Sequence, residues 1–118
     1  MILNKGNYYI GDPCYFIKDE DWEDFLDQLT GQEYEGGTGE VNFKGKTLFT
    51  SSTKYGDGTY LDNGDNRYPV DTGLISVIPT NIYQENLQIK SYYLDTDFVC
   101  ETVDDEGVIR IGDIEIYT

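Results

Sequence analysis

The chain has 118 residues, with 23 Asp and Glu against 8 Lys and Arg and no His, so its formal net charge at pH 7 is -15. This charge argues against direct binding to nucleic acid or to an anionic membrane, and it favours a partner protein with a basic surface. Because His is the commonest general base and a common metal ligand, its absence favours a binding function over an enzymatic one.

The length predicts a single domain spanning residues 1–118, and 11 Tyr with 13 Gly indicate short strands joined by tight turns. No stretch approaches the roughly 20 apolar residues of a membrane span, and residues 1–6 do not resemble a secretory leader, so we expect the cytoplasm of a bacterial host cell. Cys14 and Cys100 lie far apart without a CxxC pair, as is typical of buried apolar thiols in a reducing compartment.

The first part of the chain predicts two strands and a helix. Residues 7–10 and 14–17 have strand composition, and the Gly-Asp-Pro between them predicts a tight corner. A helix over about residues 21–30 follows from apolar side chains at i, i+3, i+4 and i+7, with Asp19 or Asp21 as its cap and Gly31 as its stop signal. We expect four core side chains from this pattern, namely Trp22, Phe25, Leu26 and Leu29.

Beyond residue 36, short apolar or alternating runs between turn signals predict strands. These runs cover residues 41–43, 47–51, 59–61, 74–78, 87–94, 98–103, 108–111 and 114–117, with a helical turn at 79–83. The predicted fold class is therefore α+β: a twisted, mainly antiparallel sheet or small open barrel, built around one core, with one amphipathic helix packed on it.

Residues 18–35 carry eight acidic side chains and a single Lys. Such runs often only keep a protein soluble, but closely spaced like charges cost stability through mutual repulsion. Because DNA presents dense negative charge, carboxylates projecting from a helix can occupy a basic groove built for phosphates. The predicted partner-binding residues are Asp19, Glu20, Asp21, Glu23, Asp24, Asp27, Glu33 and Glu35.

A second candidate site lies among the Gly- and Asp-rich turns of residues 11–15 and 56–73. Its carboxylates and tyrosines indicate a small-molecule or nucleotide pocket formed by Asp12, Tyr15, Asp57, Tyr60 and Asp71. Calcium prefers oxygen ligands of this kind, but the spacing of the four turn aspartates (Asp57, Asp62, Asp65 and Asp71) does not match an EF-hand loop, so hairpin turns are the favoured interpretation. We therefore expect neither a metal nor a cofactor.

The sequence offers no specific catalytic constellation. Cys14 has no neighbouring His, Lys or Arg to stabilise its thiolate, and the many carboxylates make any acid pair unspecific. There is no Walker loop, no G-x-G-x-x-G and no basic patch with interleaved aromatics.

Four strings carry a resemblance: YIGDPCY at 9–15, YGDGTY at 55–60, YPVDTGLI at 68–75 and GVIRIGDIEIYT at 107–118. On these the chain resembles a family of small proteins of unknown function from bacteriophages and bacterial genomes. The resemblance implies a single domain of phage or mobile-element origin and, by association, a role in the contest between phage and host.

Three functional hypotheses follow. The first is a non-enzymatic phage or prophage accessory protein that inhibits a host defence or nucleic-acid-binding protein by mimicking a polyanion such as DNA. The second is a small-molecule or nucleotide-binding module at the turns, and the third is a structural or assembly protein of a phage particle. The sequence leaves the oligomeric state and the identity of the partner open.

Overall fold

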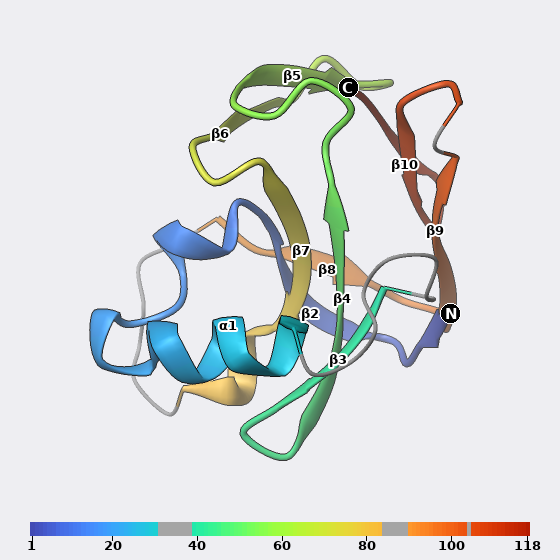
Figure 1. The fold of residues 1–118 in the computed structure, drawn as a ribbon. Helices are drawn as coiled ribbons and strands as arrows, with labels where there is room; N and C mark the ends of the chain where they lie inside the picture. Colours follow the sequence, from blue (N-terminus) through green and yellow to red (C-terminus); the bar gives the residue numbers. More distant parts are fainter. Residues whose placement is uncertain (31–38, 84–89, 104) are drawn as a thin grey trace.

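The computed structural model describes residues 1–30, 39–83, 90–103 and 105–118, and it contains two antiparallel sheets and one short α-helix (Figure 1). The first sheet has six strands in the order β1 (Ile2–Leu3), β9 (Phe98–Val103), β10 (Val108–Ile111), β11 (Ile114–Tyr117), β5 (Gly58–Asp62) and β6 (Arg67–Val70). The second has five, in the order β3 (Glu40–Phe43), β4 (Lys46–Ser52), β7 (Leu74–Pro79), β2 (Gly6–Gly11) and β8 (Tyr92–Leu94).

The fold class predicted from the sequence is confirmed, since every strand pairing is antiparallel and helix α1 (Trp22–Thr30) packs on the second sheet. In each sheet the two outermost strands do not pair with one another, so the described residues do not form a closed barrel. No helix in the described part of the chain is long and apolar enough to cross a membrane.

The expectation of one core is wrong, because the central strands of the second sheet, β4 and β7, are buried on both faces and contribute to two separate clusters. One face packs against the first sheet through side chains such as Ile10, Phe49 and Val77. The other face packs against α1 and its preceding segment through Leu48 and Ile78. Four consecutive buried residues in both β4 and β7 follow from this position between two layers.

Helix α1 buries a narrower stripe than its sequence predicts. Phe25 and Leu29 are buried, and the Phe25 ring lies edge-on to Phe43, with ring centroids 5.6 Å apart. Trp22 stacks on Phe25 at 5.5 Å and is half-buried. Leu26 is 37% exposed, so its assignment to the core is wrong. Its side chain lies at the edge of the stripe, and it is not part of the cluster that α1 forms with the sheet.

The strand predicted at residues 14–17 is also wrong. Pro13 occupies the first turn of a 3-10 helix, η1 (Pro13–Tyr15), where its fixed φ and missing N–H are well tolerated. The N–H groups of Phe16 and Ile17 both donate to the Pro13 carbonyl, at 3.0 and 2.8 Å. The chain therefore coils immediately after β2, and a second short 3-10 helix, η2 (Asp19–Asp21), leads into α1.

Most other predicted elements are present, including the turn at 79–83, which is the 3-10 helix η3 (Thr80–Ile82). Strand β6 is not among the predicted strands, and it contains Pro69, a residue that is disfavoured in strands. It is the last strand of its sheet, where a missing N–H need not break a ladder. The strand predicted at 87–94 begins only at Tyr92, and residues 87–89 lie outside the described part of the chain.

Candidate functional site

Five exposed carboxylates form what we call the acidic face: Asp19, Glu20, Glu23, Asp24 and Asp27. Helix η2 carries the first two, and α1 carries the others. With 3.6 residues per turn, the three on α1 fall on the side opposite Phe25 and Leu29. The packing that buries the apolar stripe therefore turns these carboxylates to solvent.

The acidic face is poorly compensated by cations. All eight Lys and Arg lie in the described residues, yet no ion pair there involves Asp19, Glu20, Glu23 or Asp24. Helical side chains three or four positions apart have Cβ atoms about 5–6 Å apart, so neighbouring carboxylates repel one another. Their place in the first turns is favourable, because the helix dipole is positive there.

Asp21 differs from its acidic neighbours. It is half-buried and accepts a hydrogen bond from the Tyr83 hydroxyl at 2.7 Å, while Lys44 Nζ lies 3.4 Å away. The Tyr83 hydrogen bond, together with Lys44, lowers the pKa of Asp21 below its usual range. Burial and the Asp21 carboxylate raise the pKa of Tyr83 to about 12. Through its contact with Tyr83, Asp21 therefore links η2 to the residue that follows η3. The other two predicted acidic residues, Glu33 and Glu35, lie outside the described residues.

Asp12 connects the motif at residues 9–15, to which it belongs, with the motif at residues 68–75, which contains Asp71. Its carboxylate is fully buried and accepts hydrogen bonds from the N–H groups of Cys14 (2.9 Å), Asp71 (2.7 Å) and Thr72 (2.8 Å), and from the Thr72 hydroxyl (2.8 Å). The Tyr15 hydroxyl donates to the Asp71 carboxylate. Three of the five predicted pocket residues, Asp12, Tyr15 and Asp71, are therefore brought together.

The hydrogen bonds to Asp12 determine its protonation. Burial alone would raise its pKa, but the donors of Thr72 and Cys14 outweigh burial and hold the pKa below its ordinary value. Asp62 is a second case: it is buried, and it accepts from the N–H groups of Gly64 and Asn66 and from the Tyr68 hydroxyl. Burial opposes ionisation there too, yet these donors lower its pKa. Both carboxylates are ionised structural acceptors at neutral pH.

The other two predicted pocket residues lie elsewhere. The Tyr60 hydroxyl donates to the Gly56 carbonyl at 2.8 Å, and the exposed Asp57 belongs to the same turn. This turn touches the Asp71 turn, since the Thr53 N–H donates to the Gly73 carbonyl at 2.9 Å. The turn aspartates do not gather: the described residues contain no group of three or more Cys, Asp or Glu side chains placed to hold a metal ion.

A hollow of about 200 Å³ lies between the end of β2 and strand β6, and we call it the tyrosine hollow. It contains the predicted Asp12 and Tyr15. Sequence reasoning missed its remaining polar and aromatic lining, which comprises Tyr9, Arg67, Tyr68, Lys90 and Tyr92. The close spacing of cations and tyrosines in Arg67-Tyr68 and Lys90-Ser-Tyr92 is the signal that could have indicated it.

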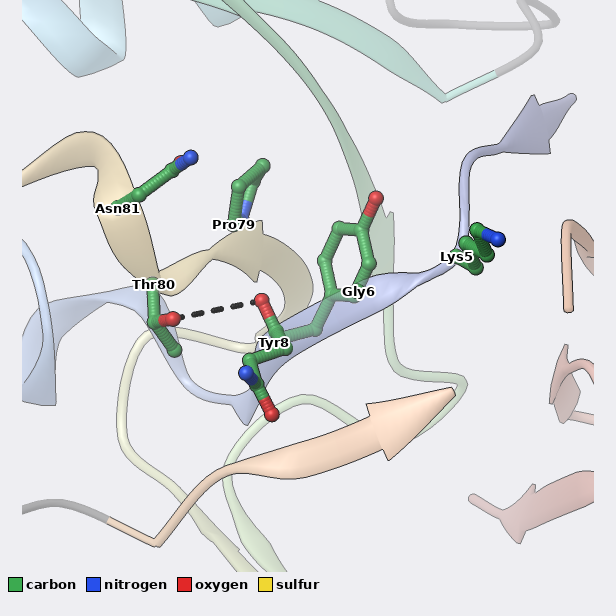
Figure 2. Close-up of a pocket in the computed structure, with 7 residues that line it drawn as sticks. Lys5, Gly6, Tyr8, Pro79, Thr80 and Asn81 are labelled. Atoms are coloured by element: carbon green, nitrogen blue, oxygen red, sulfur yellow. Dashed lines mark hydrogen bonds between the residues drawn. The ribbon is translucent and has the colours of Figure 1, made fainter. Parts of the chain in front are cut away.

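A second hollow, of about 180 Å³, lies where the start of β2 meets η3, and Figure 2 shows its lining. Lys5 and Asn81 lie at opposite ends of the group, and the Thr80 hydroxyl donates to the Asn7 carbonyl at 3.4 Å. Lys5 is the single charged side chain in this lining, and Tyr8 the single aromatic one. This hollow therefore offers less recognition chemistry than the tyrosine hollow.

Both thiols are held in their protonated form. Cys100 is fully buried, and burial raises its pKa to about 12. Cys14 is half-buried and not fully buried as expected, yet partial burial, with the hydrogen bond and negative charge of Asp12, raises its pKa to about 12 as well. Because the thiolate is the reactive form, neither side chain is suited to nucleophilic attack at neutral pH.

No family model, curated protein or solved structure matches the chain. The resemblance to small phage and bacterial proteins therefore stays a prediction. Its first and third motifs, at 9–15 and 68–75, do meet in space through Asp12 and Asp71.

Proposed function

We propose that this protein is a phage or prophage accessory protein that acts by binding, as an acidic inhibitor of a host protein. The acidic face would occupy a basic, nucleic-acid-binding surface of a defence or nucleic-acid-handling factor in the bacterial cytoplasm. The observation that carries the proposal is that Asp19, Glu20, Glu23 and Asp24 are exposed together without an ion pair to the described residues, although these residues include all eight Lys and Arg of the chain.

The physics of such a contact resembles that of DNA binding. Duplex DNA carries one negative charge per roughly 1.7 Å of axis, and proteins neutralise it with clusters of Lys and Arg. Acidic side chains whose Cβ atoms lie about 5–6 Å apart on a helix present a similar row of charges. The net charge of -15 would also speed the encounter with a basic cleft over long range. Such binding weakens as salt is added.

Two variants with equal charge changes test the proposal. The face variant replaces Asp19, Glu20, Glu23, Asp24 and Asp27 with Asn or Gln. The control variant does the same to five exposed acids outside the acidic face, namely Asp57, Asp95, Asp105, Glu106 and Asp113. Each change makes the net charge less negative by the same amount, so a difference between the variants reports position and not total charge.

The measurement is affinity capture from host lysate at low and high salt. We expect the unaltered chain and the control variant to retain the same nucleic-acid-handling protein at low salt, and the face variant to lose it. High salt should release the partner from both the unaltered chain and the control variant. Equal retention by both variants, equal loss from both, or no specific partner would contradict the proposal.

A further inference from the structure

The tyrosine hollow lies beside one edge of each sheet. Within the described residues, strand β8 pairs with β2 only as far as Tyr8, so no described strand pairs with Tyr9 to Gly11 on that side. Strand β6 is the outermost strand of the six-stranded sheet. The hollow between these two edges is lined by Ile10 and Gly11 from one strand and by Pro69 from the other.

The aromatic walls of the hollow are held rigidly. The Tyr9 hydroxyl donates to the Asp12 carbonyl at 2.6 Å, and the Tyr9 ring stacks on Phe16 with centroids 5.0 Å apart. The Tyr68 hydroxyl donates to Asp62 at 2.7 Å, and Tyr92 stacks on the Tyr68 ring at 6.4 Å. Tyr68 is only 2% exposed and supports Tyr92, so the accessible ring surface of the hollow comes from the half-buried Tyr9 and Tyr92.

Two cations lie on the rim of the hollow in a protein with few cations. Arg67 and Lys90 are both exposed, and neither forms an ion pair with the described residues. Lys90 is oriented by a 3.1 Å hydrogen bond to Asn66 Oδ1, and its Nζ lies 5.2 Å from the centroid of the Tyr92 ring. The buried Asp12 carboxylate is saturated by its own donors, which leaves the two cations to recognise a ligand.

We propose that the tyrosine hollow binds a small organic anion that contains one flat ring and one phosphate or carboxylate group. The ring packs against the tyrosine walls and Pro69, while the anionic group meets Arg67 and Lys90. A guanidinium pairs with either oxyanion through two parallel hydrogen bonds. At about 200 Å³ the hollow is below the usual range for drug-sized ligands, so it suits a single ring. This site is separate from the acidic face.

Four probes at fixed ionic strength test the chemistry: a pyrimidine nucleoside 5′-monophosphate, the matching nucleoside, benzoate and inorganic phosphate. Calorimetric titration gives the affinity, and amide chemical shifts give the location. We expect the monophosphate or benzoate to bind, and whichever binds identifies the anionic group. The nucleoside and free phosphate should bind at least about tenfold more weakly, because each lacks one half of the recognition. The shifted amides should be those of Ile10, Gly11 and Arg67.

Variants of the lining complete the test. Arg67→Gln should weaken binding by about tenfold or more, whereas Lys46→Gln makes the same charge change on the β3–β4 hairpin and should leave affinity unaltered. Tyr92→Leu removes one aromatic ring from the lining and leaves the charges of Arg67 and Lys90 unchanged. It should also weaken binding. An unchanged melting temperature in the Arg67 variant would show that its fold is intact. Failure of all four probes, equal affinity for nucleoside and monophosphate, or full affinity in Arg67→Gln would overturn the inference.

Discussion

Replacing Asp12 with Asn should cost far more stability than its conservative appearance indicates. The amide keeps one acceptor oxygen, and its NH₂ group must replace either Oδ2, which accepts from the N–H groups of Asp71 and Thr72 at 2.7 and 2.8 Å, or Oδ1, which accepts from the Cys14 N–H at 2.9 Å and the Thr72 hydroxyl at 2.8 Å. A hydrogen bond to a charged group contributes about 1.5–3 kcal/mol. Losing two of them in a fully buried position predicts a loss of about 3–6 kcal/mol.

Urea denaturation, followed by the fluorescence of the single Trp, Trp22, measures this loss as a shift in midpoint at constant slope. Asp57→Asn is the matched control, because Asp57 is exposed and the same chemical change there should stay within about 0.5 kcal/mol. A loss below about 1 kcal/mol for Asp12→Asn, with an unchanged slope, would refute the role assigned to this carboxylate.

The pH dependence gives a second check on Asp12. Its pKa is lower in the folded chain than the ordinary value near 4, so its ionised form stabilises the fold at neutral pH. That contribution is complete above the unfolded pKa and disappears as the pH falls through the lower folded pKa. The difference in stability between the unaltered chain and Asp12→Asn should therefore be constant from about pH 7 to 5 and shrink below about pH 4. A difference that grows in acid would contradict the sign.

Further outcomes follow from packing and protonation. Phe25→Ala should cost about 3–5 kcal/mol in urea denaturation, and Leu26→Ala less than about 1 kcal/mol, since only Phe25 is buried; equal losses would contradict the stripe described for α1. Iodoacetamide should modify Cys14 and Cys100 of the folded chain far more slowly than after unfolding in urea, because both thiols have a pKa of about 12; rapid labelling of the folded chain at pH 7 would disprove this. Calcium should not raise the melting temperature beyond magnesium at equal ionic strength, whereas a saturable calcium-specific rise would reveal a metal site.

Local patterns in the sequence predicted most of the fold. The antiparallel strands and α1 follow from alternation, turn signals and helical spacing, which depend on residues close together in the chain. The errors came from tertiary position. Leu26 satisfies the helical spacing but is not part of the cluster that α1 forms with the sheet, and Pro69 is tolerated because β6 happens to be an outer strand.

The candidate sites were predicted less completely, because they depend on which segments meet. The sequence indicated Asp12, Tyr15 and Asp71, but nothing local shows that the Asp12 carboxylate reaches the Asp71 backbone. The residues of β6 and β8 that line the tyrosine hollow come together only through the order of strands in the two sheets. No single segment of the sequence determines that order. Gly11 is a related case: an added Cβ would lie 2.8 Å from the Tyr9 hydroxyl, a close approach that only the fold reveals.

Displacement of a labelled DNA duplex from the captured host protein tests the central claim most directly. Fluorescence anisotropy at low salt would follow the duplex as the unaltered chain, the face variant or the control variant is added. We predict that the unaltered chain and the control variant release the DNA at similar concentrations, and that the face variant does so only at concentrations about tenfold higher or more. Equal displacement by all three chains would show that total charge and not the acidic face competes with DNA, and would contradict the proposed function.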